Sequence, residues 1–188
     1  MRRLILVVST MALTLLVAGG VALAATIHCP NSTQLFCYGT SLADTMYGSD
    51  LSDIMYGKGG ADTMHGYGAS DNLQGDNGSD HIYGDAGNDD SLWGGAYNEG
   101  TNENTDTSDD YVHGGSGADF ILGGIAQGGV DRLYGEGGND IIGSSQRADA
   151  FSPVTKEIID CGAGASDEVW FDKNKDTITN CEIKHGVS

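Results

Sequence analysis

YGTSLADTM YGSDLSDIM YGKGGADTM HGYGASDNL QGDNGSDHI YGDAGNDDSL is the sequence of residues 38–92, and its pattern recurs every nine residues. Each unit has Gly second, Asp seventh and Leu, Ile or Met last, and the sixth unit contains one extra residue. A fixed period over consecutive units is an internal repeat, which decides the fold before local propensity does. The unit reads as a glycine turn with a carboxylate, followed by a short strand with one apolar side chain. Such a unit can bind a hard cation.

The pattern continues, with interruptions, toward the C-terminus. It returns as GGSGADFIL from residue 114, GEGGNDII from residue 135 and GAGASDEVW from residue 162. Two nine-residue units make one coil, and the inserted stretches fall in units seven, nine and eleven, so we expect the long loops to leave one edge. We divide the chain into an N-terminal cap (25–37), a repeat region (38–142) with an insertion at 94–110, and an irregular segment with a C-terminal cap (143–188).

The middle residue of each short strand is expected to face inward, because side chains alternate along a strand. One inward side chain per unit gives a thin core that is stable only when neighbouring units stack. The predicted inward residues are Met46, Met55, Met64, Leu73, Ile82, Leu92, Val112, Ile121, Leu133 and Ile142.

The N-terminus is typical of export. Arg2 and Arg3 precede an apolar run that is short for a membrane span, and Ala22-Leu23-Ala24 has the small residues of a cleavage site. Residues 1–24 are therefore interpreted as a signal peptide, with a membrane anchor as the alternative. We expect a secreted, extracellular chain without stable membrane insertion after cleavage.

Charge excludes one class of partner. Cleavage after residue 24 leaves seven basic residues against 27 acidic ones, a formal charge of −20. Nucleic-acid binding requires a basic surface and is not expected. Such a charge repels itself and opposes compaction unless cations neutralise it.

Four cysteines lie near the two ends of the chain, at Cys29, Cys37, Cys161 and Cys181. An even number of cysteines in an exported chain indicates disulfides, and three connectivities are possible. We favour the local pairs Cys29–Cys37 and Cys161–Cys181, because each would staple one end of the array.

The units quoted above resemble the RTX, or haemolysin-type, calcium-binding repeat, G-G-x-G-x-D-x-U-x with U apolar. The resemblance implies an all-β fold, a right-handed parallel β-roll (a β-helix-like solenoid) with disulfide-stapled ends. It also implies that several Ca²⁺ ions are bound in the turns. Each ion would sit between turns one full coil apart, held by backbone carbonyls and Asp carboxylates.

Carried onto this sequence, the resemblance pairs Asp62 with Asp80 on one edge, and Asp89 with Asp119 and Asp119 with Asp140 on the other. Leu42 and Leu51 take a position where glycine is expected in a left-handed conformation, so strain is predicted in their turns and calcium sites are not expected there. The implied metal-binding residues are Gly57, Gly59, Asp62, Gly66, Gly68, Asp71, Gly75, Asn77, Asp80, Gly84, Ala86, Asp89, Gly114, Ser116, Asp119, Asp131, Gly135, Gly137 and Asp140.

No enzyme is predicted. The sequence has neither His-Glu-x-x-His nor Gly-x-Ser-x-Gly, and the carboxylates of the 94–110 insertion, including Asp106, are interpreted as a solvated loop. The alternative function is an adhesin that binds a cell-surface polysaccharide through aromatic rows. Tyr38, Tyr56 and Trp93 would share one face, and Tyr47 and Tyr83 the other. Cross-strand packing is the simpler interpretation of these rows.

Overall fold

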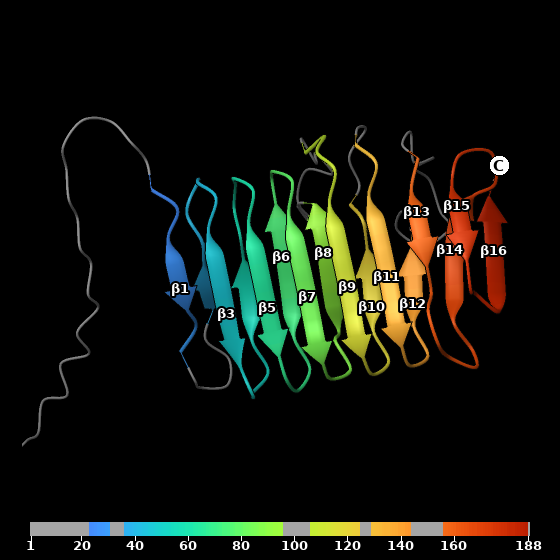
Figure 1. Cartoon of the computed structure of the whole chain (residues 1–188), viewed down its shortest axis with the longest axis horizontal. Coiled ribbons are helices and arrows are strands. Elements are labelled where there is room, and N and C mark those ends of the chain that lie inside the picture. Colours follow the sequence, from blue (N-terminus) through green and yellow to red (C-terminus); the bar gives the residue numbers. More distant parts are fainter. Residues whose placement is uncertain (1–22, 31–35, 96–105, 125–128, 144–155, 188) are drawn as a thin grey trace, which may run out of the picture.

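The computed structural model describes residues 23–30, 36–95, 106–124, 129–143 and 156–187. This part of the chain forms sixteen β-strands and no helix. The strands alternate between two eight-stranded parallel sheets, one holding the odd-numbered strands and one the even-numbered strands. Figure 1 shows them side by side along the long axis, from β1 at one end to β16 at the other. The protein is a parallel β-solenoid, as the repeat predicts.

The strands are short. The odd sheet consists of β1 (Thr26–His28), β3 (Thr45–Ser49), β5 (Thr63–Tyr67), β7 (His81–Ala86), β9 (Tyr111–Ser116), β11 (Arg132–Gly137), β13 (Ile158–Asp160) and β15 (Thr177–Thr179). The even sheet consists of β2 (Phe36–Tyr38), β4 (Ile54–Tyr56), β6 (Asn72–Asp76), β8 (Ser91–Gly95), β10 (Phe120–Leu122), β12 (Ile141–Gly143), β14 (Glu168–Asp172) and β16 (Ile183–Val187).

Successive coils stack in register, so equivalent residues form straight columns. Met46 lies opposite Met64, and Met64 opposite Ile82. All ten residues predicted to face inward are fully buried, which confirms the assignment of the core. Ile159 and Val169 extend the same buried column toward the C-terminus. Because each unit adds one inward side chain, no single coil has a core of its own.

Two edges join the sheets. At the insertion edge the chain passes from the even to the odd sheet, and at the regular edge it passes from the odd to the even sheet. The connections β8–β9, β10–β11 and β12–β13 all cross the insertion edge, as predicted for the long loops. The inserted residues 96–105, 125–128 and 144–155 lie outside the described residues. Both sheets continue beyond residue 142 through β13–β16, so the segment expected to be irregular also contributes strands to the coil.

Disulfides close both ends of the solenoid. Cys29 is bonded to Cys37, and Cys161 to Cys181, with Cα–Cα distances of 5.5 and 5.2 Å. The local connectivity is therefore confirmed. None of the described residues belongs to a helix that could cross a membrane. Residues 1–22 of the predicted signal peptide lie outside the described residues.

Candidate metal centre

Six-residue turns connect the strands, and their backbone makes two left-handed steps. The second residue is left-handed at Lys58 and Asp76, with φ of 76° and 72°. The fourth residue is left-handed at Gly60 and Gly78, with φ of 109° and 126°. Ala69 adopts φ of 72° at this fourth position although it is not glycine, so the turn retains its shape at a modest steric cost.

One oxygen of each turn Asp is used to join neighbouring coils. The Asp62 backbone N–H donates to Asp80 Oδ1 at 2.8 Å, and the Asp80 N–H donates to Asp110 Oδ1 at 2.9 Å. We call this series of hydrogen bonds, from the N–H of one turn Asp to the Oδ1 of the next, the Oδ1 staircase. The regular edge has the same staircase, in which the Asp89 N–H donates to Asp119 Oδ1 and the Asp119 N–H to Asp140 Oδ1. Each pair that the sequence placed around one ion is therefore brought together on one edge.

The second oxygen of most of these carboxylates has no partner. Seven Oδ2 atoms are buried without a hydrogen bond, and they belong to Asp62, Asp71, Asp80, Asp89, Asp119, Asp140 and Asp167. A buried, unpaired carboxylate oxygen costs several kcal/mol in real proteins unless a proton or a cation compensates it. A column of such atoms in register therefore indicates that a cation belongs beside them.

Each unpaired oxygen faces a small space that only glycine leaves open. A Cβ atom added to Gly57 would lie 2.4 Å from Asp62 Oδ2 and 2.5 Å from the carbonyl oxygen of Gly75, one coil further on. At Gly84 the corresponding distances are 2.1 Å to Asp89 Oδ2 and 2.5 Å to the Gly114 carbonyl oxygen. The carboxylate of one turn and the carbonyl of the next turn on that edge thus converge on one point. Anionic and carbonyl oxygens in this arrangement suit Ca²⁺.

Burial makes these carboxylates hard to ionise. Desolvation, reinforced by neighbouring carboxylates, raises the pKa of Asp62 and Asp89 to about 6 and that of Asp80 to about 8. It raises the pKa of Asp71 and Asp140 to about 7 in the same way. A bound divalent cation would reverse this effect, because it stabilises the charged form.

The carbonyl oxygen of the third residue in these turns accepts a hydrogen bond from the adjacent coil. The Gly60 N–H donates to the Asn77 carbonyl oxygen at 3.0 Å, and the Gly117 N–H donates to that of Gly137 at 2.7 Å. The Gly87 N–H donates to Ser116 in the same way. These carbonyls belong to residues predicted as backbone ligands, and each retains a second lone pair.

The two N-terminal turns are built differently. The Thr40 N–H and Oγ1 both donate to Asp44 Oδ2, at 2.6 and 2.9 Å, and Ser49 does the same for Asp53 Oδ2 at 2.6 and 3.0 Å. Each of these turns therefore closes on its own Asp, and neither Oδ2 atom is left unpaired. The predicted strain at Leu42 and Leu51 is wrong, because neither residue is left-handed.

A similar self-closed turn lies near the other end. The Asp172 N–H donates to Asp176 Oδ2 at 2.6 Å, which spans the same four residues as the bond from Thr40 to Asp44. Self-closed turns thus flank a central set of turns whose carboxylates have an unpaired oxygen.

The sequence analysis did not predict that two further carboxylates on the insertion edge are buried. Asp106 is 5% exposed, and its Oδ1 accepts the N–H groups of Gly78 and Ser108 at 3.2 Å, so its interpretation as part of a solvated loop is wrong. Glu157 is 1% exposed and follows residues that match no repeat unit. Its place in the column of turn carboxylates follows from its position directly before β13, a strand that the repeat pattern does not predict. Within the described residues, no three His, Cys, Asp or Glu side chains converge into a metal centre, so backbone carbonyls must complete any site.

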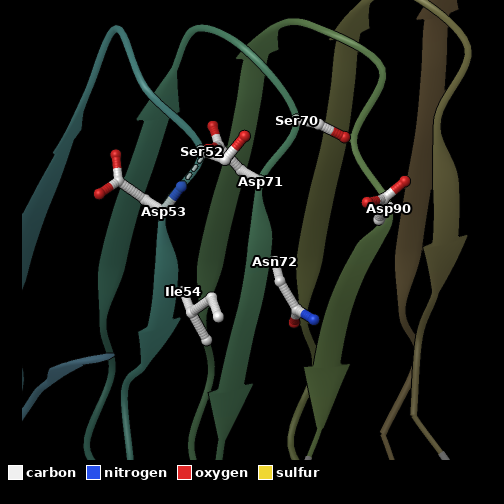
Figure 2. Close-up of a pocket in the computed structure, with 7 residues that line it drawn as sticks. All are labelled: Ser52, Asp53, Ile54, Ser70, Asp71, Asn72 and Asp90. Atoms are coloured by element: carbon white, nitrogen blue, oxygen red, sulfur yellow. Dashed lines mark hydrogen bonds between the residues drawn. The ribbon is translucent and has the colours of Figure 1, made fainter. Parts of the chain in front are cut away.

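A shallow hollow opens on the regular edge beside the start of β4, β6 and β8. Figure 2 shows Ser52, Asp53 and Ile54 on one side, Ser70, Asp71 and Asn72 beside them, and Asp90 across the hollow. Asp90 is part of the one-residue expansion in the sixth unit, and its N–H donates to the Asp71 carbonyl oxygen at 3.1 Å. The expansion is accommodated locally, and the Oδ1 staircase continues past it from Asp71 to Asp89.

Aromatic rings form a stack along the outer face of the odd sheet. The centroids of Tyr47 and His65 are 5.7 Å apart, those of His65 and Tyr83 4.7 Å, and those of Tyr83 and His113 5.0 Å. His28 and Tyr134 extend the stack at its ends. Adjacent rings are within 22° of parallel, so their faces cover one another and their edges point to solvent. On the even sheet Tyr38 and Tyr56 stack in the same way. This geometry gives the rows a packing role.

Comparison with known families decides how these turns are classified. The family model for the RTX calcium-binding nonapeptide repeat matches residues 38–69, 65–96 and 104–127. This chain carries RTX calcium-binding repeats. The matched residues contain five of the seven Asp residues with an unpaired Oδ2, and they include the strands from β3 to β10. Searches of curated proteins and of solved structures returned no match.

Proposed function

We propose that the RTX turns bind several Ca²⁺ ions and that binding is coupled to folding of the central coils. The observation that carries this proposal is the register of unpaired, buried Oδ2 atoms, five of which, those of Asp62, Asp71, Asp80, Asp89 and Asp119, lie beside a glycine carbonyl of the next coil. A hard cation satisfies both kinds of oxygen at once. The proposal assigns the chain no catalytic role.

The ions would lie between turns one coil apart on each edge. On the insertion edge one ion is shared by the turns of Asp62 and Asp80. On the regular edge the turns of Asp89, Asp119 and Asp140 share two further ions. The remaining ligands are backbone carbonyls from the first and third residues of each turn, at the glycines, Asn77, Ala86 and Ser116 named above. Water molecules would complete the coordination.

Electrostatics gives calcium its effect on folding. The whole chain has a formal charge of −18, and its turn carboxylates are stacked in two columns. Extracellular calcium modules bind with dissociation constants of about 10⁻⁴–10⁻³ M. At roughly millimolar free calcium each such site adds about 0.4–1.4 kcal/mol. Three such sites together add about 1.2–4.2 kcal/mol, a sizeable share of a typical net stability of about 5–15 kcal/mol.

The two ends are suited to remain ordered without calcium. Each has a disulfide and a turn that closes on its own Asp. In a stacked solenoid, folding propagates from neighbour to neighbour, so an ordered end can serve as a template for the next coil. We therefore place the calcium-dependent step in the coils between residues 57 and 140.

Export is part of the proposal. Residues 1–24 have the composition of a signal peptide, and both disulfides favour an oxidising compartment. Calcium is about millimolar outside cells, in the range of extracellular calcium modules. The chain would then fold fully after it leaves the cell.

The polysaccharide alternative gains no support from the ring geometry. Stacking on a sugar requires an open ring face, whereas His65 lies between Tyr47 and Tyr83. Calcium binding with ordered ring stacks accounts for both features.

The test is a circular dichroism titration of residues 25–188, first stripped with chelator and then supplied with calcium, with magnesium as control. A cooperative gain of β signal with calcium alone is expected. A chain that is fully folded in chelator and does not respond to calcium would refute the coupling.

A further inference from the structure

The insertion edge continues beyond the last matched repeat, and Glu157 occupies the turn-Asp position there. The Ile158 N–H donates to the Asp131 carbonyl oxygen at 2.9 Å, and the Thr177 N–H donates to the Glu157 carbonyl oxygen at 2.9 Å. Asp131, Glu157 and Asp176 therefore lie on successive coils of one column. Neither Glu157 nor Asp176 falls within the residues matched by the family model.

The Glu157 carboxylate is buried and incompletely bonded. The residue is 1% exposed, and its Oε2 atom is buried without a hydrogen-bond partner. The staircase is also interrupted here, because no hydrogen bond joins the Asp131 N–H to Glu157 in the described part of the chain. Glu157 thus lacks the bond that fixes the first oxygen of the turn Asp residues elsewhere.

The charges of three other carboxylates act on Glu157. Asp131 and Asp172 are 6% and 5% exposed, and Asp176 Oδ1 accepts the Glu157 N–H at 3.0 Å. Burial, followed by the charges of Asp176, Asp131 and Asp172, raises the pKa of Glu157 well above its ordinary value. Lys175 Nζ lies 3.5 Å from Asp172 Oδ2 and offsets one of these charges. The local balance remains strongly negative.

The neighbouring turn is already braced by its own backbone. Asp176 Oδ2 accepts the Asp172 N–H at 2.6 Å, and Asp172 Oδ1 accepts the Asn174 N–H at 2.8 Å. The turn therefore holds its carboxylates in place without a metal ion. Because these carboxylates are already held by hydrogen bonds, a cation bound beside them would need little reorganisation of the turn.

We propose that Glu157 is a ligand of a further divalent cation of the Ca²⁺ type, held between Asp131 and the turn Asp172–Asp176. The site differs from the repeat turns, because a longer side chain replaces Asp and carboxylates replace the glycine carbonyls. Water and backbone oxygens complete it, since side chains alone do not converge there. This inference is linked to the proposed calcium binding of the repeat turns only because the same ion, Ca²⁺, is used to test both.

The test compares calcium binding by wild type, Glu157→Gln and a control, Glu168→Gln, each as disulfide-intact residues 25–188. Glu168 lies at the same end of the solenoid but pairs with His185 rather than with a carboxylate. Titration calorimetry should show one ion fewer in Glu157→Gln, or one site weakened at least tenfold. Glu168→Gln should bind as wild type does.

Terbium luminescence locates the ion. Trp170 is two residues from Asp172, about 7 Å along an extended strand, so it can sensitise Tb³⁺ bound at this site. The Trp-excited signal should fall in Glu157→Gln and in Trp170→Phe, and it should not fall in Glu168→Gln.

Each result of the binding measurements either supports or overturns the proposed Glu157 site. If Glu157→Gln binds the same number of ions with unchanged affinity, Glu157 is a buried protonated acid and the site does not exist. If Glu157→Gln does not fold, Glu157→Asp retains the charge on a shorter side chain, and a tenfold loss at one site supports the proposal while unchanged binding overturns it. If wild type binds no calcium, the proposed function fails as well, which is a distinct result.

Discussion

Replacing Gly57 by Ala fills the space where a carboxylate and a carbonyl oxygen converge. The new Cβ atom would lie 2.4 Å from Asp62 Oδ2 and 2.5 Å from the Gly75 carbonyl oxygen, so both oxygens must move. Gly59 in the same turn is a matched control, because a Cβ there would lie 3.6 Å from its nearest atom, the Asn77 carbonyl oxygen. Both changes are Gly→Ala, and neither glycine has a positive φ.

The expected difference is large enough to measure. Overpacking of this kind costs about 1–3 kcal/mol, and loss of one ion at millimolar calcium costs up to about 1.4 kcal/mol more. Alanine also restricts the unfolded chain, which raises the unfolding free energy of both variants by about 0.4–1 kcal/mol. Gly57→Ala should therefore lower the unfolding free energy by roughly 2 kcal/mol, within a range of about 0.4–4 kcal/mol, whereas Gly59→Ala should raise it by about 0.4–1 kcal/mol.

Urea unfolding at fixed calcium measures both changes, and calorimetry counts the ions. The reasoning is refuted if the two variants have equal stability and bind the same number of ions. If Gly57→Ala loses stability but binds as many ions as wild type, the steric clash is supported and a calcium ion at this turn is contradicted.

Further predictions concern the carboxylates and the ends. Asp119→Asn keeps the acceptor for the Asp89 N–H, so it should stabilise the chain in chelator and remove bound calcium, as calorimetry and melting in both buffers can check. Asp62, Asp71 and Asp80 have raised folded-state pKa values. The folded chain therefore holds more protons than the unfolded chain above about pH 4. In chelator, stability should be greatest below that pH and decline as pH rises through about 6 to 8, and calcium should flatten the decline; a flat profile in chelator would contradict this. Ser49→Ala removes the 3.0 Å bond to Asp53 Oδ2, so melting should show a loss of about 1 kcal/mol that is equal with and without calcium. Replacing Cys161 and Cys181 by Ser opens a loop with a sequence separation of 20 and should cost about 3 kcal/mol in urea unfolding.

The sequence predicted the column structure of the fold because the repeat is strict. A side chain such as Ile82 can face only inward once its unit takes one strand and one turn, and stacking then places equivalent residues in register. Counting the repeat units also predicted that all the inserted loops leave the same edge of the solenoid. The disulfides followed from the position of each local pair at one end.

Other features depend on three-dimensional detail that the pattern does not contain. The Oδ1 staircase requires knowing that one coil rises by one strand spacing, so that the Asp62 N–H meets Asp80. Leu42 avoids a left-handed conformation because Thr40 closes its turn instead, an alternative that the repeat does not reveal. Glu157 follows a stretch without repeat signal. The stacked rings were predicted as rows, but their edge-on orientation was not.

The most direct test of the central claim is anomalous diffraction from crystals grown with calcium. The account predicts calcium peaks between successive turns on both edges, at about 2.3–2.6 Å from the second carboxylate oxygens of Asp62, Asp89 and Asp119. Peaks absent from these turns at millimolar calcium, with the same oxygens bonded to protein N–H groups or to water, would contradict it.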